Sequence, residues 1–142
     1  MARIKIELPA QLPFRTMLPL RITDLNYGGH VGNDRILSLM HEARVQYLHH
    51  LGLREVHEGT GLIMADAAIE FKKELFYGDR LEVSVGAGEF TRVGFELFYL
   101  FEKGNGETRQ PAVLAKTAMV CYDYTNQKIM ALPAELRQKL TP

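Results

Sequence analysis

The stretch that decides the fold is residues 21–51, RITDLNYGGHVGNDRILSLMHEARVQYLHHL, in which a glycine-rich corner runs directly into an amphipathic pattern. From Asn33 to Leu51 apolar residues recur at helical spacing, and Gly52 follows as a typical stop signal. The spacing therefore predicts a helix over 33–51 that is entered from a Gly-Gly-His corner. Its apolar stripe comprises Ile36, Met40, Ala43, Tyr47 and Leu51, with Leu39 beside it.

Strand patterns flank this helix on both sides. Residues 13–25 read as one extended segment that Pro19 interrupts, which favours a sheet edge or a bulge at that position. After a loop-like stretch at 54–61, four long strand patterns follow, separated by turn signals such as YGD and GNG. A short C-terminal helix is expected at 132–140, where Pro133 is tolerated in the first turn. The four strand patterns cover residues 62–75, 80–90, 93–103 and 111–124.

The order of one strand, one helix and four consecutive strands predicts an α+β protein with an antiparallel sheet packed against the helix. We expect residues 1–142 to form a single domain with the hotdog fold, a long central helix wrapped by a curled antiparallel five-stranded sheet. The helix is expected to pack on an uninterrupted apolar face of the strand that follows it, whose small alanines allow a close approach. That face comprises Ile63, Ala65, Ala67, Ile69 and Phe71.

Composition narrows the classes of function. The chain has 142 residues, and 17 Lys plus Arg balance 17 Asp plus Glu, so no basic excess suggests a nucleic-acid partner. No apolar run approaches the roughly 18 residues of a membrane span, and the N-terminal segment lacks the apolar run of a signal peptide. The single cysteine, Cys121, cannot form an internal disulfide, which favours a reducing, cytoplasmic location. No histidine has a metal-ligand partner at useful spacing, so we expect neither a metal nor another cofactor.

The corner and its helix resemble the acyl-CoA thioesterases of the 4-hydroxybenzoyl-CoA thioesterase-like hotdog family. That family has an Asp-x-Asp pair, a Gly-His-Val-Asn-Asn corner and a helical Glu-x-Ala-Arg, which are matched here by Asp24, by Gly29–Val31 with Asn33, and by Glu42–Arg44. The resemblance covers nearly the whole chain. It implies hydrolysis of an acyl-CoA or acyl-carrier-protein thioester by a homodimer or homotetramer, in which sheets join edge to edge and active sites lie at the subunit boundary.

The chain departs from the family pattern at two positions. Asn26 stands where the family often has its catalytic carboxylate, and Gly32 replaces the first asparagine of the corner. The first departure removes the group that would attack the thioester or activate water. Asparagine can still orient a water or donate a hydrogen bond, although it is also a common turn residue at the end of a strand.

The residue types of the corner indicate what it can do chemically. A helix N-terminus offers unpaired N–H donors, and glycines such as Gly29 let a ligand approach the backbone closely. The amides from Val31 to Asn33 are therefore candidates to hold the thioester oxygen, and His30 can donate to the carbonyl or hold a water. The alternative is a glycine-rich helix entry in which the histidine only satisfies local backbone groups.

With Asn26 in place of an acid, a general base must come from elsewhere in the chain. Asp66 interrupts an apolar strand and is a candidate, although an exposed or interface aspartate explains it as well. Asp34 suits the helix dipole in the first turn, a structural role. The catalytic candidates are therefore Asn26, His30, Asn33 and Asp66.

Other acids and loops have less specific interpretations. Asp24 is expected to pair with a basic residue such as Arg21 or Arg44. The TRVGF turn places Arg92 and the amides near Gly94 where they can meet the phosphates of coenzyme A, or else it forms a solvated hairpin tip.

Two further functions stay open at this point. Hotdog enoyl-CoA hydratases carry a pattern similar to Asp-x-Asn-x-x-His, which Asp24, Asn26 and His30 match with one extra residue. A non-catalytic acyl-CoA-binding protein would keep the pocket and lack the carboxylate, as this chain does at position 26.

Overall fold

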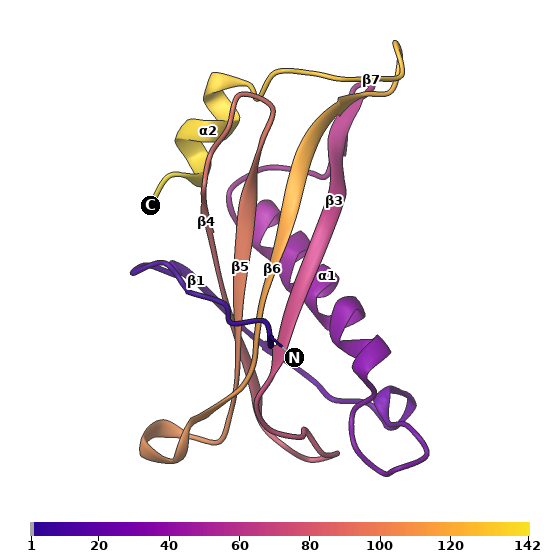
Figure 1. Ribbon diagram of the computed structural model, residues 1–142, viewed down its shortest axis with the longest axis vertical. Coiled ribbons are helices and arrows are strands. Elements are labelled where there is room, and N and C mark those ends of the chain that lie inside the picture. Colours follow the sequence, from indigo (N-terminus) through magenta and orange to yellow (C-terminus); the bar gives the residue numbers. More distant parts are fainter. Residues whose placement is uncertain (1) are drawn as a thin grey trace.

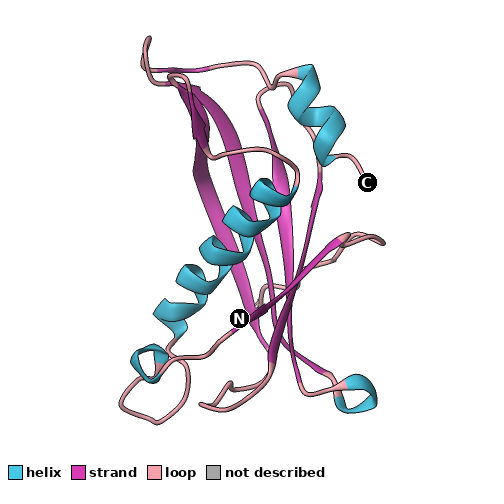
Figure 2. Ribbon diagram, turned by 180° about the vertical axis from the view of Figure 1, so that it is seen from behind, coloured by secondary structure: helices cyan, strands magenta, loops and turns pink. Residues whose placement is uncertain are grey.

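The computed structural model describes residues 2–142, which form one antiparallel sheet with a long helix along one face (Figures 1 and 2). The strand order is β1-β4-β5-β6-β3-β2, with β7 paired to β6, and this confirms the predicted α+β hotdog arrangement. No helix in the described part of the chain is long and apolar enough to cross a membrane. The elements are β1 (Phe14–Leu18), η1 (Ile22–Asp24), α1 (Asn33–His50), β2 (Val56–His57), β3 (Thr60–Phe71), β4 (Leu81–Gly88), β5 (Gly94–Lys103), η2 (Gly106–Thr108), β6 (Gln110–Asp123), β7 (Lys128–Ile129) and α2 (Ala134–Leu140).

The sheet has two more strands than the five predicted, β2 and β7, and each is only two residues long. β2 forms in the segment expected to be a loop, where Val56–His57 pair with Thr60–Gly61. The two residues between them, Glu58 and Gly59, have φ values of 50° and 81°. Positive φ at both central positions gives the tight turn whose twist suits an antiparallel hairpin. A glutamate in that conformation is unusual, and the sequence therefore carried no clear hairpin signal here.

Helix α1 begins and ends close to the predicted positions. Its end has the two hydrogen bonds of a Schellman motif, from Leu53 N–H to the Leu48 carbonyl (2.7 Å) and from Gly52 N–H to the His49 carbonyl (2.9 Å). Gly52 has a φ of 76°, which explains the glycine at this position. The face turned to the sheet buries Ile36, Leu39, Met40, Ala43, Arg44, Tyr47 and Leu48.

The core lies between α1 and alternate residues of the central strands. Because strand side chains alternate between faces, every second residue of β4, β5 and β6 points toward the helix. This packing holds the N-terminal end of α1 against the end of the sheet where β3 stops and β6 starts. The buried residues of these strands that face the helix include Leu81, Val83, Val85, Leu97, Tyr99, Phe101, Val113, Ala115 and Thr117.

Strand β3 ends at Phe71, four residues before the predicted end at Leu75, and its side-chain pattern also differs from the prediction. A bulge between Met64 and Asp66 shifts its register against β6, so the uninterrupted apolar face expected from residue 63 to residue 71 is broken. A bulge reverses the alternation of side chains. Ile69 lies opposite Ala115 on the helix side, whereas Ile63 lies on the other face of the sheet.

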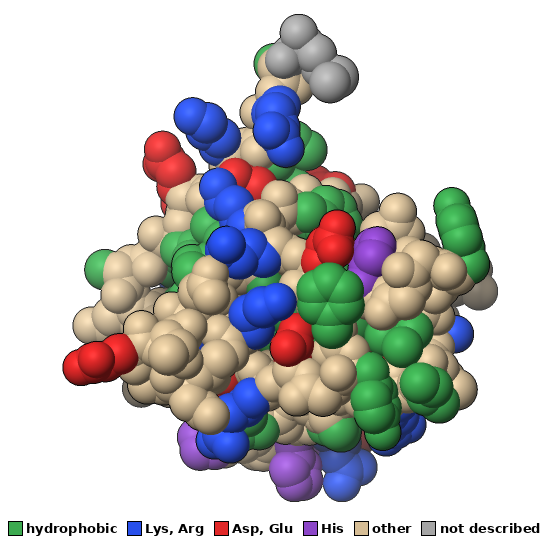
Figure 3. Space-filling model, turned by 90° about the horizontal axis from the view of Figure 1, so that it is seen from below, with side chains coloured by type: hydrophobic (Ala, Val, Ile, Leu, Met, Phe, Trp, Pro, Cys, Tyr) green, Lys and Arg blue, Asp and Glu red, His purple; other side chains and the backbone are tan. Residues whose placement is uncertain are grey.

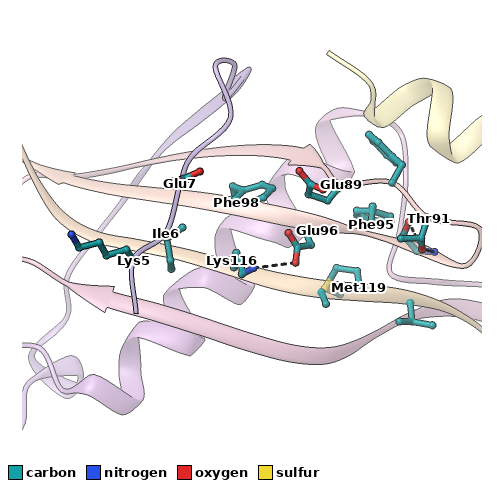
Figure 4. A pocket seen from close by; sticks show the side chains of 14 residues that line it. Lys5, Ile6, Glu7, Glu89, Thr91, Phe95, Glu96, Phe98, Lys116 and Met119 are labelled. Carbon is teal, nitrogen blue, oxygen red and sulfur yellow. Dashed lines mark hydrogen bonds and ion pairs between the residues drawn. The ribbon is translucent and has the colours of Figure 1, made fainter. Parts of the chain in front are cut away.

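The N-terminal segment crosses the sheet on the face away from α1. Ile6 is buried there, and its N–H donates to Oε1 of Glu70 (3.1 Å). The cavity of about 670 Å³ beside this segment is open, and an ion pair between Lys116 and Glu96 (3.3 Å) lies on its floor (Figure 4). This face is therefore partly covered by the chain itself.

Candidate active site

Backbone hydrogen bonds close the glycine-rich corner between η1 and α1. The N–H of Asn26 donates to the carbonyl of His30 (2.8 Å), and the N–H of Gly29 donates to the carbonyl of Asn26 (3.1 Å). Leu25 and Val31 add an isolated antiparallel bridge. Gly29 has a φ of 82°, a left-handed conformation that favours glycine. The glycine is therefore required for the shape of the turn.

The side chain of Asn26 has a role within the turn. Its Oδ1 accepts a hydrogen bond from the N–H of Gly28 (2.8 Å), which is the pattern of an Asx turn. Asn26 therefore acts as a turn residue, which was one of the two roles considered from the sequence. The amide Nδ2 finds no partner among residues 2–142, so Asn26 retains an unused hydrogen-bond donor, and its neutral amide cannot act as a base.

The amides available at the helix start differ from those expected. The N–H of Val31 donates to the carbonyl of Leu75 (2.8 Å), which ties the corner to the β3–β4 loop, and the N–H of Gly32 also has a backbone acceptor. These two amides are not free for a ligand, contrary to expectation. The first two helical residues, Asn33 and Asp34, have N–H groups for which no acceptor is present in the described part of the chain. Their amides form the open donor pair at the positive end of the helix dipole.

His30 is held beside this donor pair. Its Nδ1 lies 3.2 Å from the carbonyl oxygen of Val31, and its ring meets the ring of Phe76 edge-on at 6.3 Å between centroids. When Nδ1 carries the proton and donates to that carbonyl, Nε2 is left as an acceptor. Nε2 lies 3.5 Å from the place that a side chain on Gly28 would occupy, on the side of the turn where Asn26 lies.

A cavity of about 320 Å³ opens beside the corner. Side chains of His30 and Asn33 border it, and most of the remaining wall is apolar, as in ordinary ligand pockets. The end of the molecule that carries the corner shows Lys and Arg side chains next to exposed hydrophobic ones (Figure 3). The rest of the lining comprises Val31, Ile36, Phe71, Lys72, Lys73, Glu74, Leu75 and Val113.

Three other predicted site residues do not meet the corner within one protomer. Asp66 is exposed and lies opposite Ala118, on the sheet face away from α1. Arg92 is exposed on the β4–β5 hairpin, at the other end of the sheet from the start of α1 (Figure 1). Gly94 is buried, and its N–H already donates to Oγ1 of Thr91 (3.1 Å), so its amide is not open to a phosphate.

The sequence did not predict the buried polar network around Arg44. The Nε of Arg44 donates to Oε1 of Glu55, and its Nη1 donates to the hydroxyl of Tyr99 (3.2 Å). The Tyr99 hydroxyl is also 2.9 Å from Oγ1 of Thr117. The pairing of Arg44 with Asp24 considered from the sequence is therefore wrong, because Asp24 accepts from a backbone amide instead.

A signal for this network was present in the helix. Arg44 follows Met40 by four residues and precedes Leu48 by four, so it lies on the apolar stripe. Burial alone would lower the pKa of Arg44, but Tyr99 and Glu55 together hold that pKa above its usual value. The guanidinium is therefore charged inside the core, where it needs its two partners.

Comparisons with known proteins agree with this geometry. Residues 20–140 match the model of the thioesterase-like superfamily. A 1,4-dihydroxy-2-naphthoyl-CoA hydrolase of Thermosynechococcus vestitus is 28% identical over 121 residues, which are 82% of this chain and 81% of that protein. Among solved structures, a hypothetical protein from Aquifex aeolicus has a TM-score of 0.82 at 25% identity, covering 91% of this chain and all of that one (100%). A 1,4-dihydroxy-2-naphthoyl-CoA thioesterase from Synechocystis has a TM-score of 0.80 at 23% identity, covering 89% and 94% of the two chains. The match over most of its length shows that the chain belongs to the thioesterase-like superfamily.

Proposed function

We propose that the protein hydrolyses an acyl-CoA thioester to a carboxylic acid and free coenzyme A. The observation that carries this proposal is the open pair of amides at Asn33 and Asp34 at the start of α1, where His30 and Asn33 line a mostly apolar cavity. Two N–H donors at one point stabilise the oxyanion that forms when a thioester carbonyl is attacked. The relatives named above are hydrolases of CoA thioesters, which supports the same chemistry here.

In this proposal each group of the corner has a separate task. The helix amides and Nδ2 of Asn26 donate to the thioester oxygen, and His30 orients the carbonyl or the attacking water. The acyl group enters the cavity between α1 and the end of β3. At about 320 Å³ this cavity is near the lower end of ordinary ligand pockets, which favours a compact acyl group. The relatives named for an aromatic acyl-CoA make aroyl-CoA thioesters the first compounds to test.

We also propose that the active form is a homodimer, or a tetramer built from such dimers, in the cytoplasm. The short β2 covers only the start of β3, so the rest of this 12-residue strand is a sheet edge. Met64 and Phe71 on that strand are 47% and 51% exposed. A long edge strand has unpaired backbone N–H and C=O groups, and its apolar side chains favour pairing with another strand. A second copy of β3 is the simplest partner. Such pairing would also let the partner subunit bring Asp66 or Arg92 closer to the corner.

The test is a thiol-release assay over a panel of aromatic and aliphatic acyl-CoA and acyl-carrier-protein thioesters. Release of free CoA supports the proposal, hydration of an enoyl-CoA would indicate a hydratase, and binding without turnover would indicate a binding protein. We expect His30→Ala to lower turnover by about 100-fold or more, the scale of losing one oxyanion-type contact. His49→Ala, at the opposite end of α1 and exposed, is the matched control. If folded His30→Ala and Asn26→Ala hydrolyse at the parent rate, the corner is only structural.

A further inference from the structure

The proposed site still needs a base for its attacking water, and this inference rests on the proposed function. Water attacks a thioester efficiently only when a nearby group removes its proton. Asn26 cannot do so, and its Oδ1 is already occupied by the N–H of Gly28. The required carboxylate must therefore be found among the acids that surround the corner.

Asp34 brings a carboxylate to the position next to Asn26. Asp34 is the second residue of α1, and its Oδ1 folds back over Gly32, so that a side chain built on Gly32 would overlap it. The same point on Gly32 lies 3.6 Å from Cβ of Asn26. The side chains of Asp34 and Asn26 therefore flank one glycine, next to the open amides of the helix start.

Gly32 is needed here for space and not for its backbone conformation. Its φ of −69° and ψ of 147° are ordinary values for any residue. What a side chain at this position would meet is the Asp34 carboxylate and, further away, Asn26. The glycine therefore leaves open the position that the carboxylate of Asp34 occupies.

The carboxylate of Asp34 is also available for proton transfer. Among residues 2–142 it has no ion pair and no hydrogen bond, and it is exposed to water. Of the other acids near the corner, Asp24 accepts from the N–H of Arg21 (2.8 Å) and Asp79 pairs with Lys103 (3.3 Å). Glu74 on the cavity wall is exposed and has no ion pair in the described part of the chain, and it is the competing candidate for the base. Asp34 differs from Glu74 in that its carboxylate lies over Gly32, the glycine that Asn26 also borders.

We infer that Asp34 is the general base of the hydrolysis, in place of the acid that Asn26 lacks. Its carboxylate removes a proton from water while the water oxygen bonds to the thioester carbon, and the carbonyl electron pair moves to the oxygen held by the amides of Asn33 and Asp34. The carbonyl then re-forms, the carbon–sulfur bond breaks, and the Asp34 carboxylic acid returns the proton to the departing thiolate. The products are a carboxylic acid and the free thiol of coenzyme A, and water is the only co-reactant.

The experiment compares four variants with the parent in the thiol-release assay, using the acyl-CoA that the parent hydrolyses fastest. Asp34→Asn keeps the shape of the side chain and should lower kcat by about 100-fold or more with a small change in KM, the range for losing a general base. Gly32→Ala should also lower kcat, because the added methyl displaces the carboxylate. Glu135→Gln, which removes an exposed acid from the first turn of α2, is the matched control and should retain the parent rate.

The fourth variant combines Asp34→Asn with Asn26→Asp, so that a carboxylate returns on the other side of Gly32. Its new oxygen can still accept from Gly28, and kcat should recover at least tenfold relative to Asp34→Asn alone. If the folded Asp34→Asn variant has a kcat within threefold of the parent value, this inference is overturned and the proposed function still stands. The same conclusion follows if the double variant has no higher kcat than Asp34→Asn alone. A parent protein that releases no thiol from any thioester overturns both.

Discussion

Removing Glu55 is expected to destabilise the protein more than removing the buried arginine that it pairs with. Arg44 is a charged side chain with only 9% of its surface exposed, whereas Glu55 is 23% exposed. Glu55→Ala leaves the guanidinium charged inside the core, with Tyr99 as its remaining partner. Breaking a buried pair in this way costs about 3 kcal/mol, at the lower end of the usual range because water can reach the site of Glu55.

The reverse change, Arg44→Met, removes the buried charge and replaces it with an apolar side chain of similar length. The Glu55 carboxylate can then be solvated by water, and the Tyr99 hydroxyl keeps its hydrogen bond to Thr117. We therefore expect the free energy of unfolding to fall by about 1 kcal/mol. For a protein of this size 1 kcal/mol corresponds to about 3 °C in Tm. The Tm of Glu55→Ala should therefore be about 6 °C lower than the Tm of Arg44→Met.

Thermal unfolding at one fixed protein concentration measures this difference, because oligomerisation would otherwise shift Tm. The double variant closes a thermodynamic cycle and should be more stable than Glu55→Ala alone, since it no longer buries an unpaired charge. If Arg44→Met lowers Tm as much as Glu55→Ala or more, the network does not act as a buried charge with its compensating partners, and the reasoning is refuted.

Three other outcomes follow from the structure. Gly94→Ala should fail to fold or lose more than about 10 °C in Tm by differential scanning fluorimetry, because the new Cβ would overlap the Met119 carbonyl; at Gly88 the nearest atom is Cε2 of Phe98 at 3.4 Å, an ordinary contact, so Gly88→Ala serves as the comparison. Ala67→Arg on the exposed β3 edge should shift sedimentation toward monomer with at least tenfold weaker association, while Ala131→Arg on a loop should not. Burial raises the pKa of Cys121, Tyr47 and Tyr99, so the unfolded chain loses these protons first and stability should fall as pH rises above about 9, with a smaller fall in Cys121→Ala.

Local signals in the sequence were enough for the helix and the long strands. Helical spacing from Asn33 onward and the stop at Gly52 located α1, and turn signals such as the YGD at residues 77–79 separated the strands. These features depend on residues within a few positions of each other, where propensity and periodicity act. The extra residue in β3 between Met64 and Asp66 has no comparable local signal, because a bulge is fixed by register against β6.

The candidate site was less predictable because its decisive contacts join distant segments. The Val31 amide is taken by Leu75, 44 positions further along the chain, so an amide that looked open from the sequence is closed. Arg44 is satisfied by Tyr99, 55 positions away. Asn26 and His30 were selected through the resemblance to the thioesterase family, and their side-chain hydrogen bonds are local to the turn.

The two departures from the family pattern, Asn26 and Gly32, are connected through Asp34. Considered separately, Asn26 stands in place of the family's carboxylate, and Gly32 stands in place of an asparagine of the turn. In the folded chain Gly32 leaves open the space that the Asp34 carboxylate occupies, and Asn26 borders the same glycine. A side chain at position 32 and a carboxylate from position 34 would compete for that space, so the glycine and the aspartate are expected to change together. Residue-by-residue matching with a family pattern cannot detect such an exchange, because the carboxylate returns from a different position of the chain.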